Sequence, residues 1–404
     1  MALQLSPYEQ GMLEGKYGEA RKLAMEILAQ TAKALDAESM VEVVSVQGLS
    51  HYGCIFDAGL ELMEKFACLG GKCCVPTTQD PSSIPYKLWE AMGYDREYAA
   101  KQLRLRDAMN ELEEFSTWSC TPYYQGNCPR IRQNVAWAES SAVSYGNSVL
   151  GCRTNRTPAG LAVCAALTGR MPKYGLYLPE NRKAQIKVTL EAGTLSELDY
   201  STFGLLLGKI SGDYIPAIYG IPDSVTNDEL KSMGGSAAAS GSVALYHAVG
   251  ITPEALDGDP FANHAPLKEY VVTREMLDET AAAMTTKNPG EVELVVTGCP
   301  HASTWEVLQI SKMFEGKKVA AGKAFWIFTT LETENILDHM GVAQKLKAAG
   351  VTIMAQTCLV ISPLVGGYKT VMTDSGKSAS LIPSEHGVEL IYGSLKDCIK
   401  AVTV

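Results

Sequence analysis

Long apolar runs and a targeting signal are both missing from this sequence. No stretch reaches the roughly 18 consecutive apolar residues of a membrane-spanning helix, so none is predicted. The first residues, MALQLSPYEQGMLEG, lack the basic segment followed by an apolar one that marks a secretory signal. We therefore expect a cytoplasmic protein.

An excess of positive charge is missing as well. The chain has 35 Lys and Arg against 45 Asp and Glu, a formal net charge of −10. An acidic chain is a poor match for the phosphates of nucleic acid or of an anionic membrane, so we expect neither as a partner. The 46% apolar and 20% charged content is ordinary for a globular protein, and 404 residues suit two to three domains or one large α/β unit.

The eleven cysteines include no CxxC pair, which is the usual signature of a thiol-bound metal. In a reducing compartment they are not expected to form a disulfide framework. Most of them should be small core residues, and Cys164 and Cys398 stand in apolar segments of that kind. The remaining cysteines are the ones to consider for chemistry.

The first two thirds of the sequence predict mainly helices. Ser6, Pro7 and Glu9 form a capping box with proline at the first helical position, so a helix begins there. A second helix is expected over residues 17–35, with one buried face made of Leu23, Ile27, Leu28, Ala32 and Leu35.

Further segments follow the same reasoning. Helices are expected at residues 57–66, 95–115 and 160–169, and β segments at residues 41–46 and within the glycine-punctuated stretch 204–220. Residues 227–233 form a short helical pattern, and residues 234–250 are rich in small side chains. Such a run either lets two helices approach closely or approaches a phosphate. Because no strand–GxGxxG–helix context surrounds it, we favour helix packing.

Strands alternate with helices in the last third of the chain. Strands are predicted at residues 292–298, 324–330 and 351–357, with helices at residues 303–314 and from 331 to about 349. Residues 384–404 add one strand and one helix. This alternation predicts an α/β fold with a parallel sheet, and a last subdomain that begins at about residue 290.

Residues 116–156 are dense in side chains that do chemistry. They include Cys120, Glu139 and Arg153, interleaved with small residues such as Gly126 and Gly151 that let a ligand approach the backbone. The stretch follows neither a helical nor a strand period. It therefore either lines a site or forms a polar connector.

Three cysteines stand where the predicted strands end. Cys299 and Cys358 follow two neighbouring strands, and ligands collect beyond the carboxyl ends of parallel strands. Cys120 follows a β-prone run and also lies on a predicted loop. Together the three thiols are suited to an iron–sulfur cluster or to zinc. Three unrelated buried cysteines are the alternative.

Eight short segments, in order over about 300 residues, resemble the aconitase X family. They are VPTT (75–78), SCTPY (119–123), AESSA (138–142), NSVLG (147–151), RTNR (153–156), ASGSVAL (239–245), GCPH (298–301) and TDSGK (373–377). The resemblance implies an aconitase-like α/β core with parallel βα units in several subdomains over residues 1–404. It also implies that Cys120, Cys299 and Cys358 hold an iron–sulfur cluster, of the [4Fe-4S] or [2Fe-2S] type.

The resemblance implies a hydro-lyase that dehydrates a small hydroxy carboxylate. Members of the family act on cis-3-hydroxy-L-proline or on mevalonate 5-phosphate, the second being an archaeal activity. The 20% charged content is low for a hyperthermophilic protein, and this favours the first substrate here. A small swivelling domain, which carries a serine base, is fused or separate in the family. Because the chain ends at Val404, we expect that domain to be a separate small subunit.

Elimination of water needs a Lewis acid, a base and cations for the carboxylate. We expect His51, His301 and Ser140 to take part in the chemistry. The predicted substrate contacts are Thr77, Thr78, Ser141, Arg153, Arg156 and Lys377. The arginines suit this role because a guanidinium binds a carboxylate through two hydrogen bonds.

Two other classes of function remain open on the sequence. One is a thiol oxidoreductase that uses Cys73 and Cys74 or Cys120, and the other is a metal-binding scaffold without catalysis. An NTPase is excluded, because Val371 stands where the SGKS segment would need the first glycine of a phosphate loop. The sequence also departs from the family at Asp80, where Asn is frequent, and this affects the charge that the substrate meets.

Overall fold

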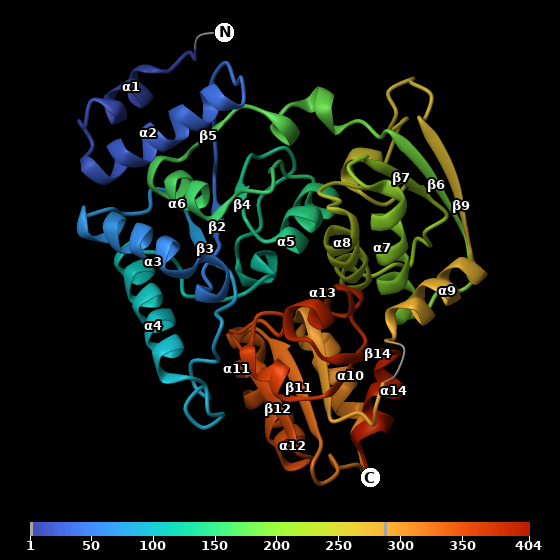
Figure 1. Cartoon of the computed structure of the whole chain (residues 1–404). Helices are drawn as coiled ribbons and strands as arrows, with labels where there is room; N and C mark the ends of the chain where they lie inside the picture. Colours follow the sequence, from blue (N-terminus) through green and yellow to red (C-terminus); the bar gives the residue numbers. More distant parts are fainter. Residues whose placement is uncertain (1–2, 287–288) are drawn as a thin grey trace. The chain divides into compact units, whose positions relative to one another are not determined.

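The computed structural model describes residues 3–286 and 289–404, and the chain divides into two compact units (Figure 1). The first unit comprises Met1–Ser82 and Asp95–Lys183. The second comprises Ser83–Tyr94 and Ala184–Val404. All but one of the sheets are parallel, so the α/β class predicted from the sequence is confirmed.

The first unit surrounds a small parallel sheet of order β3-β2-β4, and β1 and β5 form a separate antiparallel pair. Its strands are β1 (Met40–Glu42), β2 (Val46–Gly48), β3 (Thr77–Gln79), β4 (Ala136–Trp137) and β5 (Arg170–Pro172). Its helices are α1 (Pro7–Leu13), α2 (Glu19–Ala34), α3 (Tyr52–Cys68), α4 (Arg96–Glu111), α5 (Ser140–Tyr145) and α6 (Ala159–Thr168).

Local signals placed these helices well but not the first strand. The capping box at Ser6 is formed, and both of its hydrogen bonds are present. The single β segment predicted over residues 41–46 is wrong. The chain changes partners there, since Val43 N–H donates to Gly169 and Val44 N–H donates to Asn134, so β1 and β2 join different sheets.

The buried face predicted for α2 is only partly correct. Leu28 and Ala32 are fully buried, but Leu35 is 41% exposed. Small residues such as Ala20 and Ala24 are buried, whereas Leu23 and Ile27 are only partly buried. The helix therefore packs more closely than its leucines suggested.

The second unit contains two parallel sheets, of order β8-β7-β6-β9 and β12-β11-β10-β13-β14. Strands are β6 (Ile186–Glu191), β7 (Pro216–Tyr219), β8 (His247–Ala248), β9 (Lys268–Thr273), β10 (Leu294–Ala302), β11 (Ala324–Thr329), β12 (Val351–Ala355), β13 (Thr370–Thr373) and β14 (Glu389–Tyr392). Helices are α7 (Glu197–Ser211), α8 (Asn227–Gly241), α9 (Arg274–Met284), α10 (Thr304–Met313), α11 (Leu331–His339), α12 (Val342–Ala348), α13 (Gly376–His386) and α14 (Leu395–Val402).

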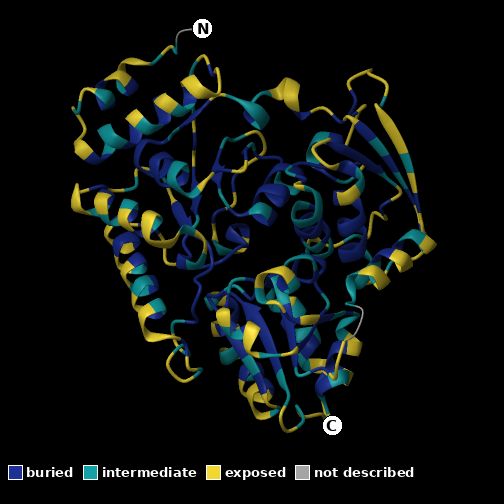
Figure 2. Cartoon of the chain, in the orientation of Figure 1, coloured by how far each residue is buried: buried dark blue, intermediate teal, exposed yellow. Residues whose placement is uncertain are grey.

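The five-stranded sheet is buried on both faces, as Figure 2 shows by its dark strands between half-exposed helices. Val295 packs with α10, α12 and α14 on one face, while its neighbours Leu294 and Val296 pack with α13 on the other. Side chains of a strand alternate in this way, and a parallel sheet covered by helices on both sides needs apolar residues on both.

Close packing explains the small residues of α7 and α8. A Cβ added to Gly241 would lie 1.8 Å from the backbone oxygen of Gly208. The expectation of helix packing is thus confirmed. The β segment placed within residues 204–220 is correct only from Pro216, because the residues up to Ser211 are helical. The short helix expected at residues 227–233 continues to Gly241.

Three further expectations need correction. The helix predicted from 331 to about 349 is broken at Gly341, whose φ of 70° ends α11 and begins α12. Strand β10 continues through Cys299 to Ala302 rather than ending at Gly298. Only Cys120, Cys152, Cys164 and Cys398 are buried, so most of the cysteines are not core residues. All eleven are free, and Cys164 and Cys398 are core residues as expected.

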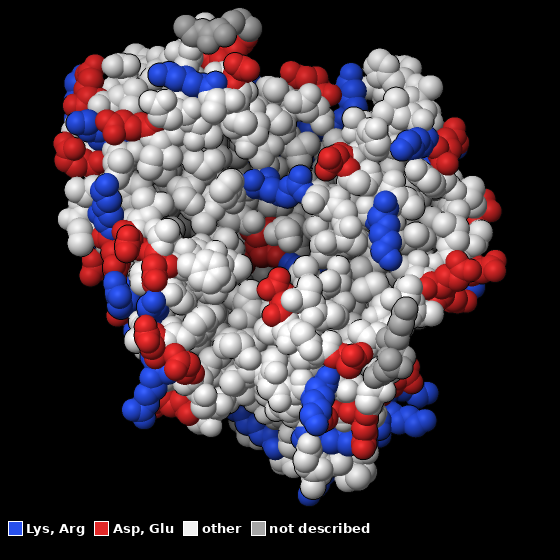
Figure 3. All heavy atoms as spheres, in the orientation of Figure 1, with Lys and Arg blue, Asp and Glu red and all other residues white. Residues whose placement is uncertain are grey.

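The surface gives no sign of a nucleic-acid face in the view of Figure 3. Lys and Arg side chains are interspersed there with Asp and Glu, so the described residues of this face form no broad basic field. Over residues 3–286 and 289–404, no helix is long and apolar enough to cross a membrane.

Candidate functional site

Cys299 lies at the carboxyl edge of the five-stranded sheet, where β10 leaves its regular register with β11. The preceding residue, Gly298, has a φ of 91°. A Cβ at that position would come within 2.0 Å of the carbonyl oxygen of Phe328. Only glycine combines this backbone conformation with this close approach. The sequence GCPH therefore sets the place of the first thiol.

Cys358 lies on the loop that follows β12 in the same unit. Burial raises the pKa of its thiol, and Cys299 raises it further. Both cysteine side chains pack against the same apolar cluster of the second unit. Lys377 and the backbone N–H groups of Val360 and Ile361 act in the opposite direction, because they stabilise the thiolate. A thiol surrounded by donors in this way is suited to bind a metal as a thiolate.

Side chains hold the backbone of both cysteine segments. Ser375 Oγ donates to the carbonyl oxygen of Cys299 at 2.5 Å, and Thr329 Oγ1 donates to that of Ala302 at 2.6 Å. His301 Nε2 donates to the carbonyl oxygen of Thr357 at 2.8 Å. The ring of His301 therefore links the segment of Cys299 to the residue before Cys358. Its role in proton transfer stays a prediction.

Helix α13 begins beside these thiols. Ser375 caps the helix, and Lys377 in its first turn is only 8% exposed. The preceding Asp374 accepts a hydrogen bond from Thr297 Oγ1 at 3.0 Å, and burial raises its pKa to about 6. A buried cation near the start of a helix favours an anionic group nearby.

A cavity of about 160 Å³ lies against Gly298, Cys299 and Pro300 within the second unit. Its charged lining is one lysine, Lys231, and five carboxylates: Glu197, Asp228, Glu229, Glu306 and Asp374. Burial, Glu229 and Asp228 raise the pKa of Glu197. The charged lining of the cavity is therefore predominantly acidic.

In the first unit, a second group of polar side chains lies at the carboxyl ends of β2 and β3. His51 Nε2 is 3.6 Å from Asp80 Oδ2, and both side chains are buried. Gln47 Nε2 donates to Asp80 Oδ1 at 3.4 Å, and Ser50 Oγ accepts from Asp80 N–H. A carboxylate beside an imidazole is a pair that moves protons in many enzymes.

Sequence reasoning missed Gln47 and Gln79, which are both fully buried. In the described part of the chain, neither amide atom of Gln79 has a hydrogen-bond partner, and Gln47 Oε1 has none either. An unmatched buried amide costs about 1–3 kcal/mol, so its presence points to a ligand. The available signal was a glutamine at the carboxyl end of each short β run, VSVQG and TTQD.

The structure gives Thr77 and Thr78 local roles. Thr77 Oγ1 donates to the carbonyl oxygen of Val75 at 3.0 Å, and Thr78 Oγ1 donates to that of Val46 at 3.3 Å. Asn127, which the sequence analysis did not single out as a site residue, donates to Thr78 Oγ1 at 3.0 Å. The contact of Thr78 holds β3 against β2, and contact of the threonines with substrate stays a prediction.

Cys120 lies on a buried loop of the first unit, as expected from its sequence. Trp118, two residues before it, has a φ of 48°, which is rare for a residue with a side chain. Gln356, two residues before Cys358, has a φ of 68°. Two of the three predicted ligands thus follow the same kind of turn in different units.

Ser140 and Ser141 are both directed to one carboxylate. Each hydroxyl donates to Glu139, and the N–H of Ala142 donates to it at 2.8 Å, so Glu139 is the cap of α5. Ser141 is 1% exposed, whereas Ser140 is partly exposed. The structure brings both serines together, and their predicted catalytic and binding roles are not tested by it.

The arginines of the RTNR segment differ in burial. Arg153 is partly buried and Arg156 is exposed. Arg182, another residue that the sequence analysis did not identify, is 3% exposed and donates to Asn147 Oδ1 at 2.9 Å and to the carbonyl oxygen of Cys152 at 3.2 Å. It supports the backbone from which Arg153 extends.

The three predicted ligands fall in different units, Cys120 in the first and Cys299 with Cys358 in the second. Among residues 3–286 and 289–404, no three His, Cys, Asp or Glu side chains lie close enough together to hold a metal ion. The two neighbouring thiols, with backbone N–H groups directed to Cys358, fit two ligands of an iron–sulfur cluster.

Comparison with protein families gives three matches along the chain. They are the aconitase X first domain over residues 2–180, the second domain over residues 184–282 and the third domain over residues 292–404. The second and third both fall in the second unit.

Individual proteins are similar over nearly the whole length. The phosphomevalonate dehydratase large subunit of Methanothermobacter thermautotrophicus is 36% identical, over 97% of this chain and 97% of that protein. The cis-3-hydroxy-L-proline dehydratase of Pseudomonas aeruginosa is 31% identical, over 98% of this chain and 70% of that protein. The crystal structure of Thermococcus kodakaraensis aconitase X in its holo-form matches with a TM-score of 0.90 at 32% identity, and covers 99% of this chain and 100% of that one.

Proposed function

Because this chain belongs to the aconitase X family and is a hydro-lyase, we propose that it eliminates water from a small hydroxy carboxylate at an iron–sulfur cluster. The observation that carries the proposal is the pair Cys299 and Cys358, which pack against one apolar cluster near the ends of β10 and β12. The charge of Lys377 stabilises the thiolate of Cys358. Cys120 is the proposed third ligand. When bound, the cluster would supply a Lewis acid for the leaving hydroxyl.

The side chains of the protein have the remaining tasks. Lys377, Arg153 and Arg156 bind the substrate's carboxylate, since each carries a permanent or near-permanent positive charge. Gln79 offers the substrate a donor and an acceptor that are otherwise unmatched. The Asp80–His51 pair holds or moves a proton of the substrate. Glu139 orients the hydroxyls of Ser140 and Ser141.

A separate small subunit supplies the base in this proposal. Relatives at 36% identity are named large subunits, which implies a smaller partner. Elimination needs a base within about 3 Å of the proton it removes. The isolated chain should therefore turn over slowly, and the small subunit should restore the rate.

The thiol oxidoreductase alternative is disfavoured by the surroundings of Cys73 and Cys74. Burial raises the pKa of Cys73 well above its usual range, and the carboxyl of Glu114 raises it further. Cys74 is exposed as a residue, but partial desolvation of its thiol still raises its pKa. A reactive cysteine needs the opposite shift, because the thiolate is the nucleophile.

The substrate that the site supports best is cis-3-hydroxy-L-proline. The cavity beside Cys299 has five carboxylates and one lysine, and an imino acid carries a positive nitrogen that this lining stabilises. A phosphate group there would meet repulsion from the same carboxylates.

Mevalonate 5-phosphate is the second candidate, and sequence identity favours it. The relatives named phosphomevalonate dehydratase large subunit reach 36% identity, against 31% and 30% for those named cis-3-hydroxy-L-proline dehydratase. Identity over a whole chain reports ancestry more than the chemistry of one cavity.

The test is steady-state dehydration of both compounds by the chain with and without the proposed small subunit. Turnover of cis-3-hydroxy-L-proline alone supports the first candidate, and turnover of mevalonate 5-phosphate alone supports the second. Full activity of the isolated chain with either compound would contradict the separate base. No turnover of any small hydroxy acid by the complex would favour the scaffold alternative.

A further inference from the structure

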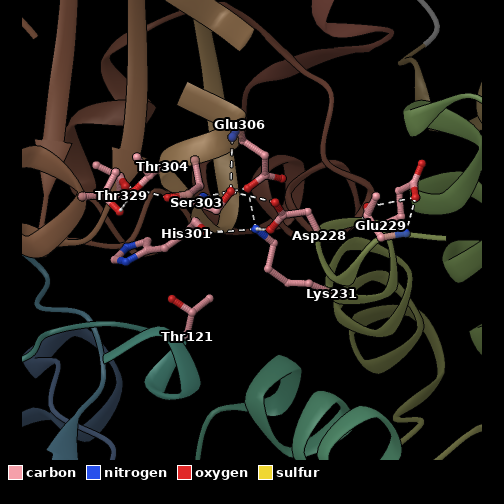
Figure 4. A network of polar contacts seen from close by, with 12 residues as sticks. Thr121, Asp228, Glu229, Lys231, His301, Ser303, Thr304, Glu306 and Thr329 are labelled. Atoms are coloured by element: carbon pink, nitrogen blue, oxygen red, sulfur yellow. Dashed lines mark hydrogen bonds and ion pairs between the residues drawn. The ribbon is translucent and has the colours of Figure 1, made fainter. Parts of the chain in front are cut away.

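Lys231 is a buried lysine on α8, and its side chain reaches the junction of β10 and α10 (Figure 4). The side chain of Lys231 is 1% exposed, and its ammonium donates to three acceptors: Asp228 Oδ1 at 2.9 Å, Glu306 Oε2 at 2.5 Å and the carbonyl oxygen of His301 at 3.3 Å. An ammonium has three N–H donors, and these contacts use all of them.

The ammonium stays charged in this position. Burial alone would lower the pKa of Lys231, but Glu306 and Asp228 outweigh it, and the pKa ends above its ordinary value. A buried charge is retained where its partners are fixed. Here Ser303 fixes both, since its N–H donates to Glu306 at 2.7 Å and its hydroxyl donates to Asp228 at 2.7 Å.

The network ends on the segment that carries Cys299. Lys231 holds the carbonyl oxygen of His301, and the ring of His301 donates to the carbonyl oxygen of Thr357, the residue before Cys358. The cation is thus connected to both thiol segments through one residue.

We propose that Lys231 is a positioning residue that sets the distance between the sulfur atoms of Cys299 and Cys358, and this rests on the proposed function of the two cysteines as cluster ligands. Without the ammonium, Asp228 and Glu306 lose the cation that they share, and the carbonyl of His301 loses the hydrogen bond from Lys231. The segment from Cys299 to Ala302 then shifts, and the ring of His301 shifts with it. A ligand displaced by about 1 Å costs up to on the order of 100-fold in processes that need fixed geometry.

The first experiment needs neither cluster nor activity. The metal-free full chain is treated with dibromobimane, which joins two thiols that lie close together, and the product joining Cys299 and Cys358 is quantified by peptide mapping. We expect Lys231→Met to slow this cross-link by about tenfold or more, while single alkylation of Cys299 by iodoacetamide continues. A wild-type cross-linking rate in Lys231→Met would overturn the proposal.

Two further variants keep the result interpretable if Lys231→Met folds poorly. The triple variant Asp228→Asn, Lys231→Met, Glu306→Gln leaves no unpaired charge but still lacks the donor to His301, so it should also cross-link slowly. Lys323→Met is the matched control: Lys323 also donates to a carbonyl oxygen (Ala401, 2.9 Å) and pairs with Glu291 at 2.8 Å, but it precedes β11 at the opposite edge of the sheet. An equal loss in Lys323→Met, or none in the triple variant, would contradict a specific role of Lys231.

The second experiment measures cluster absorbance and its decay with a chelator after anaerobic purification. Lys231→Met should lose the absorbance at least tenfold faster than wild type, and Lys323→Met should not. If wild type binds no cluster and dehydrates nothing, the proposed function fails, yet the cross-linking comparison still decides whether Lys231 sets the thiol distance. Equal decay in wild type and Lys231→Met would count against the proposal.

Discussion

The two sheet edges that carry the candidate residues are built in opposite ways. At the edge of the five-stranded sheet, the carbonyl oxygens of Cys299, His301 and Ala302 each accept a side-chain hydrogen bond. At the edge of the β3-β2-β4 sheet, the buried amide of Gln79 has no partner among the described residues.

The difference separates two tasks that a site must perform. A metal ligand must stay in one place before the metal arrives, so its backbone is held by other side chains. A group that receives a substrate must keep its hydrogen-bonding capacity available, and the protein bears the cost in stability. The edge of the five-stranded sheet is therefore tested by substitutions that remove the contacts holding its backbone. The edge of the β3-β2-β4 sheet is tested by substitutions that remove its unmatched polar groups.

The largest effect is expected from the thiols themselves. Cys299→Ser, Cys358→Ser and Cys120→Ser should each abolish the visible absorbance of anaerobically purified protein, because a serine hydroxyl is a poor ligand for iron in a cluster. Cys164→Ser and Cys398→Ser are the matched controls and should keep the absorbance. Retention of the absorbance in all five variants would show that the ligands lie elsewhere.

The next largest effect is a loss of stability from a substitution at the edge of the five-stranded sheet. Gly298→Ala should lower the free energy of unfolding by more than about 4 kcal/mol, since its Cβ would overlap the carbonyl oxygen of Phe328 at 2.0 Å. Gly322→Ala is the control: its φ of 78° is similar, but nothing lies within 4 Å of its added Cβ, so only the backbone strain of about 1–2 kcal/mol remains. Urea denaturation of both variants measures the difference. Equal losses would mean that the close approach is unimportant.

The other edge should respond to pH through Glu114, a buried carboxyl near Gly48. Burial raises its pKa from 4.5 to about 8, so between these values the folded state holds a proton that the unfolded chain releases. Stability must then fall as pH rises through this window, by up to about 1.4 kcal/mol per pH unit.

Glu114→Gln should remove that slope and become more stable than wild type as pH rises from 5 to 8. Denaturation at each pH unit in this range checks the sign. Glu111→Gln, at an exposed position at the end of α4, should leave the slope unchanged. A wild-type stability that is flat over the window would contradict a proton on Glu114.

The smallest effect is expected at Gln79, and it distinguishes a side chain that binds substrate from one with a structural role. Gln79→Met should raise the free energy of unfolding by about 1–3 kcal/mol, because it removes an unmatched buried amide, and it should lower turnover by the complex. Gln102→Met should do the reverse to stability, because Gln102 is equally buried but bonds Tyr52 N–H at 2.8 Å and the carbonyl of Ser50 at 3.0 Å. Thermal unfolding and kinetics of both variants make the comparison. Destabilisation by Gln79→Met would assign it a structural role.

Short-range signals in the sequence predicted the fold well. The capping box at Ser6 and the small residues of α8 were identified because each depends on residues a few positions apart. The alternation of strands and helices over residues 292–404 identified the parallel sheet for the same reason.

Contacts between distant residues were beyond the sequence. Lys231 holds a carbonyl 70 residues away, and Arg182 supports Asn147 at a separation of 35 residues. Neither appears in any local pattern, since a buried cation looks like an exposed one in the sequence. The unmatched amide of Gln79 is hidden similarly, because only the folded chain shows which groups lack partners.

The left-handed residues before two of the cysteines have a consequence for how the chain tolerates changes in length. Loops usually accept insertions, because their backbone is free to take up the extra residue. Between Trp118 and Cys120, and between Gln356 and Cys358, each residue that is added or removed would turn the thiol away from its present direction, since the positive φ fixes where the turn begins. We expect single-residue insertions at Ser119 and Thr357 to be as damaging as loss of the cysteine itself, although both positions lie in loops.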